Sequence, residues 1–505
     1  MKKLLAMLLC ILMVVSLVSC GGDAETSKEN SIGNEISSDA SNETSEGGKT
    51  VYKANVPEDF SWEGDFVILS TASDPSSVKY TEFGFNSSEE MEENVLNDAV
   101  ITRNDIVETL LGVKIVEEME ACNNRSETGE FVSFVENAIN SGTGDFDMVA
   151  PSLYQAGALA MNGQFYNLNE IENMSLQSEW WDEFFINAVD VMGKLYFVTG
   201  DIGFIAKDSI SAVFFNKDLA ADLELENPYQ LVKDKKWTID VIHTWAKMYN
   251  EDVDNNGSIN HLDKFGIGGQ NDNFKAFFFG AGEVFASLDN NKKPITAGYS
   301  ERSAEVADRF QEFITDKTCF VRADDLFGVS NTPVKLLVDA FVEGRALMFW
   351  DALSNIEGMR AMDVDFGILP VPLYDENQDR YSSMLTPWPS NAFAIPGSVD
   401  PSEVKNVATI MNVLGAEGKN YITPAYVETT LKGQRLRDDD SEDMLDIIFD
   451  NIGCDIGYVY CFAGTAADIL NSTAAGQNFT TLYDSYKSTL ESKMTNFVDV
   501  FESLE

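Results

Sequence analysis

Strands and helices alternate between residues 66 and 150, and this alternation narrows the choice of fold more than any other feature of the chain. Apolar runs predict three buried strands with two helices between them, the strands at 66–69, 113–116 and 147–150 and the helices at 95–111 and 131–139. Gly112 ends the first helix. Strands joined by helices of this length form a parallel sheet with right-handed crossovers, which indicates an α/β fold.

The end of the third predicted strand offers the first candidate for a binding site. In parallel sheets, ligands bind beyond the carboxyl ends of the strands. Ser152 and Tyr154 follow the strand at 147–150, so both are candidate ligand-binding residues. The alternative is an ordinary turn at the strand end, in which the tyrosine packs.

The amino-terminal residues carry the features of a bacterial secretory signal. Two lysines precede an apolar run at 4–17, which is too short to span a membrane comfortably. Ser19 before Cys20 resembles the lipobox, in which the cysteine receives a diacylglycerol and becomes the first mature residue. The alternatives are an ordinary cleaved signal and a core helix. We predict a signal peptide at 1–19, lipidation at Cys20, and a protein held on the extracellular face of the cell membrane of a Gram-positive bacterium.

The segment that begins at Cys20 is predicted to be a flexible linker. Ser, Glu, Asn and Gly dominate residues 21–50, so this stretch cannot bury enough apolar surface to offset its ordering entropy. We assign 20–57 to the lipidated cysteine and the linker. The rest of the chain is long enough for two or three domains.

The chain is strongly acidic, with 83 Asp and Glu residues against 35 Lys and Arg and a net charge of −48. Such a surface repels nucleic acid and anionic lipid, so no nucleic-acid partner is expected. Solubility at the cell surface accounts for the acidity, and a cationic ligand is the alternative.

Histidine and cysteine argue against several kinds of site. Only two histidines occur, His243 within an amphipathic helix and His261 in a loop, which disfavours Ser-His-Asp and Cys-His catalysis. A glycosidase with a pair of carboxylates stays open, because the chain offers many acids. No spacing of Cys and His resembles a zinc site. Cys454 and Cys461 lie close enough in sequence for a disulfide, and buried free thiols are the alternative.

Several motifs in the middle of the chain follow one another in an informative order. An aromatic-rich strand at 212–217 ends in Asn-Lys, Pro228 follows, and Trp237 packs at the start of an amphipathic helix for which Thr238 is the predicted N-cap. This order resembles the extracellular solute-binding proteins of bacterial ABC importers, in the large family that includes maltose-binding protein. Three later segments extend the resemblance. Segment 341–348 resembles the family's helix that ends at a glycine and the strand that returns to the first lobe. Segment 366–370 resembles the next strand, and 392–396 resembles the crossover near the hinge. Two more are similar to a clostridial branch: 375–378 and 423–426.

The resemblance implies an α/β, two-lobed periplasmic-binding-protein-like fold of type II, with a hinge between the lobes. It implies a first lobe at 58–168 plus 341–390 and a second lobe at 169–340 plus 391–505. The implied function is not enzymatic: the protein captures a solute, with an oligosaccharide favoured, and delivers it to the transmembrane subunits of an ABC permease. The alternatives are a peptide or polyamine as the solute, and a surface glycoside hydrolase lipoprotein.

The resemblance also indicates further residues of the ligand site. In carbohydrate-binding relatives, aromatic residues at matching places stack on sugar rings, and a carboxylate accepts hydrogen bonds from hydroxyls. Trp350 and Asp351 end the predicted return strand, and Trp388 lies between two prolines before the crossover strand. Trp181, next to Trp180, lies at the start of the second lobe. For each tryptophan, the alternative is that it packs in the core.

One loop matches a calcium-binding template. Its oxygen-bearing residues fall at positions 1, 3, 5, 7 and 12 of that template: Asp252, Asp254, Asn256, Ser258 and Asp263. Gly257 allows the sharp turn, while Asp263 replaces the usual glutamate and has a shorter reach. Solute-binding proteins carry a similar loop, so we expect a structural rather than a catalytic calcium ion. A loop of Asx turns without metal is the alternative.

Overall fold

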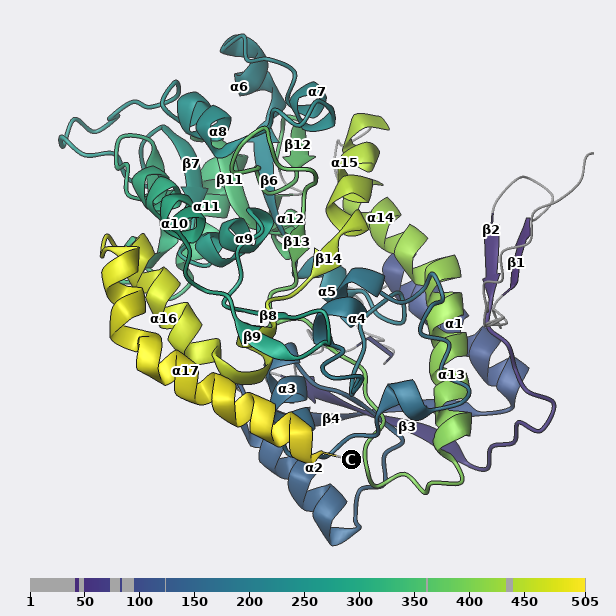
Figure 1. Cartoon of the computed structure of the whole chain (residues 1–505). Coiled ribbons are helices and arrows are strands. Elements are labelled where there is room, and N and C mark those ends of the chain that lie inside the picture. Colours follow the sequence, from purple (N-terminus) through teal and green to yellow (C-terminus); the bar gives the residue numbers. More distant parts are fainter. Residues whose placement is uncertain are drawn as a thin grey trace, which may run out of the picture. The chain divides into compact units, whose positions relative to one another are not determined.

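The computed structural model describes residues 41–44, 50–72, 82–83, 95–122, 124–359, 362–432 and 439–504, all within the unit Asp39–Glu505. The predicted signal peptide, Cys20 and most of the predicted linker lie outside the described residues. Two sheets and the helices packed on them make up most of the described chain (Figure 1). A short antiparallel pair precedes them, formed by β1 (Ser41–Thr44) and β2 (Thr50–Lys53).

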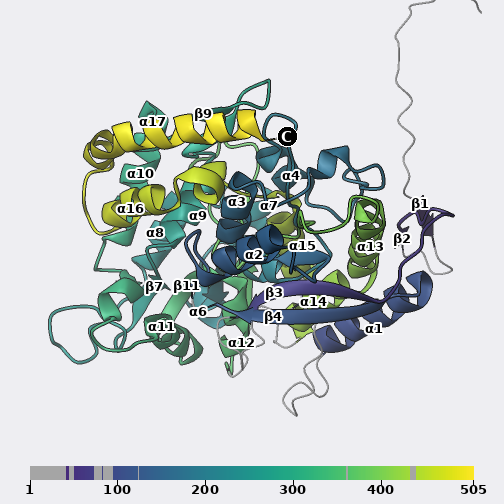
Figure 2. The same ribbon diagram turned by 90° about the horizontal axis from the view of Figure 1, so that it is seen from below.

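The first sheet forms where the sequence predicts it. It is parallel, has the strand order β4-β3-β5, and consists of β3 (Asp65–Ala72), β4 (Lys114–Ala121) and β5 (Met148–Ala150). The helices are α1 (Val95–Leu111), α2 (Glu130–Ser141) and α3 (Leu153–Met161). The chain runs from β3 through α1 to β4 and then through α2 back past β3 to β5, and α1 and α2 lie on opposite faces of the sheet (Figure 2). Gly112 follows α1 with a φ of 70°, as its predicted role requires.

The second sheet is larger and mixed. Its strand order is β10-β7-β11-β6-β12, with β6 (Ser211–Asn216), β7 (Phe265–Gly269), β10 (Phe320–Arg322), β11 (Ala346–Ala352) and β12 (Phe366–Leu369). β6 runs antiparallel to β11 and β12, and the other neighbours are parallel. The helices of this part are α6 (Lys217–Asp222), α7 (Pro228–Lys233), α8 (Ile239–Ala246), α9 (Asn273–Gly280), α10 (Glu301–Ile314), α11 (Pro333–Val342) and α12 (Ile356–Met359). Nearly every side chain of β6, β7 and β11 is buried, so both faces of this sheet are covered.

The lobe predicted for segment 341–390 is wrong for two of the strands in that segment, β11 and β12. β11 pairs with β6 and β7, and β12 pairs with β6, so both strands belong to the second sheet. Segment 391–396, which we expected in the second lobe, bridges to the first sheet instead, where Ala394 faces Val149. An apolar run identifies a buried strand without identifying the sheet that pairs with it. The motifs therefore predicted these strands correctly and their partners incorrectly.

The remaining elements are mostly helices of the carboxyl-terminal third. They are α13 (Val404–Glu417), α14 (Thr423–Lys432), α15 (Asp439–Asp450), α16 (Ala463–Ala474) and α17 (Phe479–Ser503). The short elements are α4 (Glu183–Val189), α5 (Ile205–Asp208), β8 (Ala286–Leu288), β9 (Pro294–Thr296), β13 (Ser383–Met384) and β14 (Ile452–Gly453). α17 packs against α3 beside the first sheet and against α10 beside the second.

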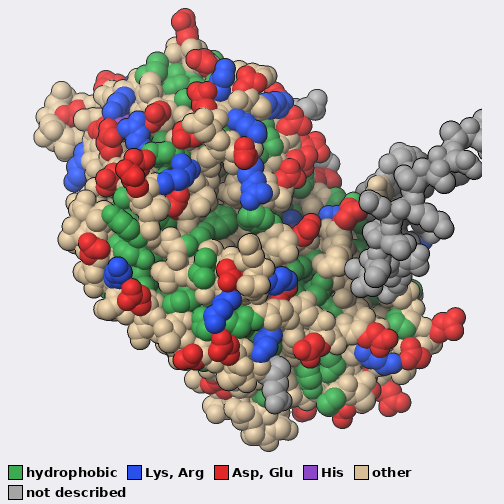
Figure 3. All heavy atoms as spheres, in the orientation of Figure 1, with side chains coloured by type: hydrophobic (Ala, Val, Ile, Leu, Met, Phe, Trp, Pro, Cys, Tyr) green, Lys and Arg blue, Asp and Glu red, His purple; other side chains and the backbone are tan. Residues whose placement is uncertain are grey.

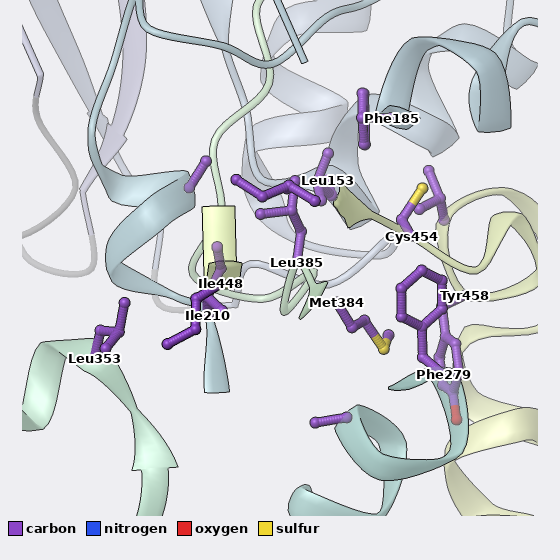
Figure 4. Close-up of a cluster of buried hydrophobic side chains, with 14 of the residues drawn as sticks. Leu153, Phe185, Ile210, Phe279, Leu353, Met384, Leu385, Ile448, Cys454 and Tyr458 are labelled. Atoms are coloured by element: carbon purple, nitrogen blue, oxygen red, sulfur yellow. The ribbon is translucent and has the colours of Figure 1, made fainter. Parts of the chain in front are cut away.

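An apolar core lies between the two sheets. Figure 4 shows buried side chains from segments far apart in the sequence, among them Leu153 of α3, Phe279 of α9, Leu385 after β13 and Ile448 of α15. Burial of these side chains stabilises the contacts between the segments that carry them and both sheets. The segments that carry the candidate site are therefore held by the core behind them.

Trp237 and Thr238 stand at the start of α8, as predicted, but the predicted capping bond does not form. Trp237 is fully buried, its Nε1 donates to the carbonyl oxygen of Pro370 at 2.9 Å, and its ring lies 5.5 Å from that of Trp245. Thr238 occupies the predicted N-cap position, but its side chain makes no capping hydrogen bond.

Two further expectations concern cysteine and the membrane. Cys454 is buried and carries a free thiol, so it forms no disulfide with Cys461. Cys122 and Cys319 are also buried free thiols. Among the described helices, none is both long and apolar enough to cross a lipid bilayer.

Candidate functional site

A cavity of about 320 Å³ lies at the carboxyl ends of β7 and β11, and α3, which follows the first sheet, also lines it. The second sheet, α9 and the residues next to them provide Ser209, Ser211, Gln270, Asp272, Asn273, Lys275, Ala276, Asp351 and Ala352. The amino terminus of α3 provides Tyr154, and the segment 384–389, called the crossing segment below, provides Met384, Thr386, Pro387, Trp388 and Pro389. Because β6 is antiparallel to β11, its first residues reach the same edge of the sheet. The cavity is therefore at the place where α/β sheets bind ligands.

Asp351 is the buried carboxylate of this cavity. Only 6% of its surface is exposed. The side-chain Nε2 of Gln270 donates to its two oxygens, at 3.1 Å to Oδ1 and 2.9 Å to Oδ2, and the backbone N–H of Ala352 donates to Oδ1 at 2.7 Å. Burial raises the pKa of Asp351 to about 7, and the nearby negative charges of Asp272 and Asp324 add to the shift. This carboxylate therefore has acceptor atoms beside the cavity and changes its charge near neutral pH.

Trp388 is the exposed aromatic residue of the cavity. Its side chain is 40% exposed, and it stands between Pro387 and Pro389, whose rings fix the backbone on either side. The buried Arg125 holds this turn, because its Nε donates to the carbonyl oxygen of Trp388 at 2.8 Å and its Nη2 donates to that of Pro389 at 3.3 Å. An indole held in this way presents an apolar face without loss of further backbone freedom.

Tyr154 also lines the cavity, on the first residues of α3. Its side chain is half-buried. Burial raises the pKa of the Tyr154 phenol well above its usual range, and the charges of Asp272 and Glu127 act in the same direction. The hydroxyl therefore stays neutral at physiological pH and can donate or accept a hydrogen bond.

The structure places Trp350 in the core rather than in the cavity. Trp350 is fully buried, and its Nε1 donates to the Oγ of Ser211 at 2.9 Å. Its ring meets that of Phe310 edge to face at 5.6 Å. Successive side chains of a strand point to opposite faces, so Trp350 and its neighbour Asp351 cannot both face the ligand. The alternative reading of this tryptophan as a core residue is the correct one.

Ser152 and Trp181 also lie outside the cavity. Ser152 is buried and caps α3, because its Oγ accepts from the N–H of Gln155 at 3.2 Å and donates to the carbonyl oxygen of Arg125 at 2.6 Å. Trp181 is 4% exposed, and its Nε1 donates to Oδ1 of Asn412 at 3.3 Å. The structure thus brings Tyr154, Asp351 and Trp388 together and separates Ser152, Trp181 and Trp350 from them.

The turn between β7 and α9 contributes residues that sequence reasoning missed. Gln270 and Asp272 line the cavity from this turn, where Oδ1 of Asn273 accepts from the N–H of Gln270 at 2.6 Å. Gly269 must be small here, because a Cβ would lie 2.5 Å from Oδ1 of Asn273. A glycine-rich strand followed by amide and acidic residues was the available signal.

The loop with the calcium template brings three carboxylates together. Oxygens of Asp252, Asp254 and Asp263 lie within 4.8 Å of one another. The same oxygens accept backbone hydrogen bonds, including N–H of Gly257 to Oδ2 of Asp252 at 2.7 Å and N–H of Asn256 to Oδ1 of Asp254 at 3.0 Å. Asp263 is fully buried and accepts backbone N–H groups on both oxygens, each at 2.9 Å.

The oxygens of this loop are the donor type that Ca²⁺ prefers. The predicted ligands Asn256 and Ser258 are bonded to each other, since Oγ of Ser258 donates to Oδ1 of Asn256 at 2.6 Å. Gly257 has a φ of 86°, which makes the predicted sharp turn possible. The donor set fits a calcium ion, and each oxygen of Asp263 accepts one backbone hydrogen bond and keeps a lone pair.

The histidines lie away from the cavity among the described residues. His243 is buried in α8, where its Nε2 lies 2.9 Å from Oδ2 of Asp316. Neither His243 nor His261 lines the cavity. His243 therefore has a structural partner on a neighbouring element, the turn after α10.

Comparison with solved structures identifies the fold. An ABC substrate-binding protein from Listeria monocytogenes in complex with cycloalternan matches with a TM-score of 0.53 and 13% identity, over 86% of this chain and 99% of that chain. A cyclo/maltodextrin-binding protein complexed with maltotetraose matches with a TM-score of 0.55 and 13% identity, over 86% of this chain and 98% of that chain. A solute-binding protein of an ABC transporter from Agrobacterium radiobacter in complex with ribitol matches with a TM-score of 0.52 and 12% identity, over 85% of this chain and 98% of that chain. No protein-family model matches the chain, and no curated protein matches its sequence.

The chain has the two-lobed, periplasmic-binding-protein-like α/β fold of these ABC solute-binding proteins. The fold class expected from the order of the motifs is confirmed. The three matched proteins are binding proteins, and the match spans nearly the whole length of each of them.

Proposed function

We propose that this protein is the solute-binding component of an ABC importer and that it captures an oligosaccharide in the cavity between Trp388 and Asp351. The observation that carries the proposal is the pairing of an exposed indole with a buried carboxylate in one cavity. A pyranose has an apolar face that stacks on an indole and a rim of hydroxyls that donate to a carboxylate. Amide and hydroxyl groups of Gln270 and Thr386 add further polar partners.

A thermal-shift screen with neutral and modified oligosaccharides tests this function. A ligand at 100 times its Kd stabilises the folded protein by about 2.7 kcal/mol, so a true solute raises the melting temperature clearly. Peptides and polyamines belong in the same screen as the other solute classes. Stabilisation by peptides alone, with none by any oligosaccharide, would contradict the proposal.

A surface glycoside hydrolase is the second candidate, because Asp272 and Asp351 both line the cavity. Glycosidases use two carboxylates, one as the acid and one as the base or nucleophile. Product analysis by chromatography separates the two functions: a binding protein returns every oligosaccharide intact, and a glycosidase shortens it.

The proposed location follows from the proposed import function. A solute-binding protein must be exported and kept near its permease, and the predicted signal peptide and the lipid at Cys20 supply both requirements. In a Gram-positive bacterium this places the protein on the extracellular face of the membrane, beside the transmembrane subunits. Cys20→Ala should release the protein from the membrane fraction. Mass spectrometry that finds a mature start elsewhere, without lipid, would contradict the anchor.

We also propose a structural calcium ion in the loop 252–263, held by oxygens of Asp252, Asp254, Asn256, Ser258 and Asp263. When bound, the ion would neutralise a cluster of carboxylates and stiffen the loop. Removal of calcium with a chelator should lower the melting temperature, and Asp254→Ala should make the protein insensitive to the chelator. Metal analysis that finds no calcium at millimolar supply would leave the loop as a set of Asx turns.

A further inference from the structure

The charges of the cavity are unevenly balanced. Among the described residues that line it, Lys275 is the only basic one, and its Nζ lies 2.6 Å from Oδ1 of Asp272, three residues earlier on the chain. The Lys275 side chain is 14% exposed, so this ion pair is fixed at the start of α9. Within the described part of the chain, the groups that donate hydrogen bonds to Asp351 are neutral: the amide of Gln270 and the N–H of Ala352.

The surroundings of Asp351 add negative rather than positive charge. The negative charges of Asp272, in the turn before α9, and of Asp324, after β10, both act on it, and Oδ2 of Asp324 accepts from the N–H of Asn271 at 2.8 Å. α3 contributes Tyr154 to the cavity wall, and the phenol of Tyr154 stays neutral. The remaining charged group of the cavity wall, Lys275, is bound to Asp272.

A buried carboxylate without a cation is unfavourable, because burial removes water that would solvate its charge. The raised pKa of Asp351 reflects this penalty. A neutral hydroxyl replaces the hydrogen bond of a water molecule but leaves the charge uncompensated. A cationic nitrogen compensates the charge and makes a stronger, charge-assisted hydrogen bond.

We infer that the oligosaccharide carries a protonated amine and that Asp351 binds this amine, so that the solute class is an amino sugar rather than a neutral glycan. The inference rests on the function proposed above and narrows its solute. Trp388 can make two kinds of contact with such a solute, because an indole face packs on a pyranose ring and also attracts a cation. Acidic and basic side chains both occur on the face shown in Figure 3.

Titration calorimetry at pH 7 with three trisaccharides of the same length tests the inference. The probes are the β1,4-linked trimer of glucosamine, its fully N-acetylated form, and cellotriose. We expect the amine form to bind at least tenfold more tightly than the other two. Asp351→Asn should abolish this preference, because it should weaken the amine form at least tenfold more than it weakens cellotriose and the acetylated trimer.

The outcomes separate the inference from the proposed function. If cellotriose binds as tightly as the glucosamine trimer, or if Asp351→Asn weakens all three probes equally, the amine inference is overturned and oligosaccharide binding stands. If none of these probes and no other oligosaccharide of the thermal-shift screen binds, the proposed function itself fails. The melting temperature of Asp351→Asn shows that the variant is folded, since loss of a buried charge should raise it.

Discussion

Trp350 and Trp388 are the same residue type and were predicted to have the same role, yet the structure places them in different environments. Trp350 lies on β11, is fully buried, and packs edge to face against Phe310. Trp388 lies on the crossing segment, is 40% exposed, and lines the cavity. The difference comes from the backbone that carries each indole: a central strand covered on both faces leaves no free surface, whereas a turn between two prolines does.

This comparison shows that a residue next to a cavity-lining residue in sequence need not line the cavity itself. Asp351 follows Trp350 directly and lines the cavity, but alternation along the strand turns the tryptophan away from it. Each region therefore has its own expected response to mutation. A change in the core should alter the free energy of unfolding, and a change in the cavity should alter affinity.

Trp350→Ala should give the largest effect. Removal of a fully buried indole leaves a cavity and should lower the free energy of unfolding by about 3 to 5 kcal/mol. Urea unfolding of the variant and the wild type measures this loss. If the variant instead keeps its stability and loses affinity for oligosaccharide, Trp350 belongs to the binding site and the comparison fails.

The pH dependence of stability tests the neighbouring carboxylate. Asp351 has a pKa of about 7 in the folded protein against about 3.9 in an unfolded chain, so the folded state binds more protons between these values. Stability should therefore fall as pH rises from about 4 to about 7. Asp351→Asn should remove this part of the fall and stabilise the protein at pH 7 by on the order of 1 to 4 kcal/mol.

Only the difference between wild type and variant isolates Asp351. Burial also raises the pKa of Glu82 to about 7 and that of Asp455 to about 6, so both contribute to the same window of pH. Urea unfolding of both proteins at several pH values gives this difference. Parallel stability curves across the whole range would show that Asp351 has no such shift.

The fold was predictable from the sequence wherever local patterns decide it. The helix expected at 95–111 is α1, because its apolar periodicity and the glycine after it are properties of the segment alone. The strand partner of β11 depends on which sheet has an edge free for it, and no local pattern carries that information. The order of the motifs predicted that β11 is a strand, but its neighbours in the sheet are seen only in the structure.

The candidate site was predictable only in part. Ser152 illustrates an available signal that was not used: Ser152 and Gln155 form a capping box, a spacing that marks a helix start. Gln270 and Asp272 illustrate a signal that is weak, since polar residues after a strand are common in turns. They join Asp351 because β7 and β11 are adjacent in the sheet, although about 80 residues separate them in sequence.

Trp388→Ala should have an intermediate effect, and it is the matched control for Trp350→Ala. Loss of an exposed indole removes apolar contact with the solute, so binding should weaken by about 1 to 3 kcal/mol, which is roughly tenfold or more. The free energy of unfolding should change by less than about 1 kcal/mol, because the side chain is exposed in the absence of solute. Calorimetry and urea unfolding on the same preparation measure both quantities. A large loss of stability with unchanged affinity would show that Trp388 is a core residue, as Trp350 is, and not a contact for the solute.

Tyr154→Phe should have the smallest effect and extends the comparison to an aromatic residue that is half-buried. The phenol stays neutral because burial raises its pKa, so its hydroxyl is available to hydrogen-bond a solute. Loss of that bond should weaken binding by about 0.5 to 1.5 kcal/mol, or roughly two- to tenfold, while the ring keeps its packing. Calorimetry with the solute found in the screen measures the change, and Tyr154→Ala shows what the ring itself contributes. If Tyr154→Phe binds as tightly as the wild type and Tyr154→Ala loses stability but not affinity, Tyr154 behaves like Trp350, and Trp388 is left as the aromatic contact among the residues predicted for this site.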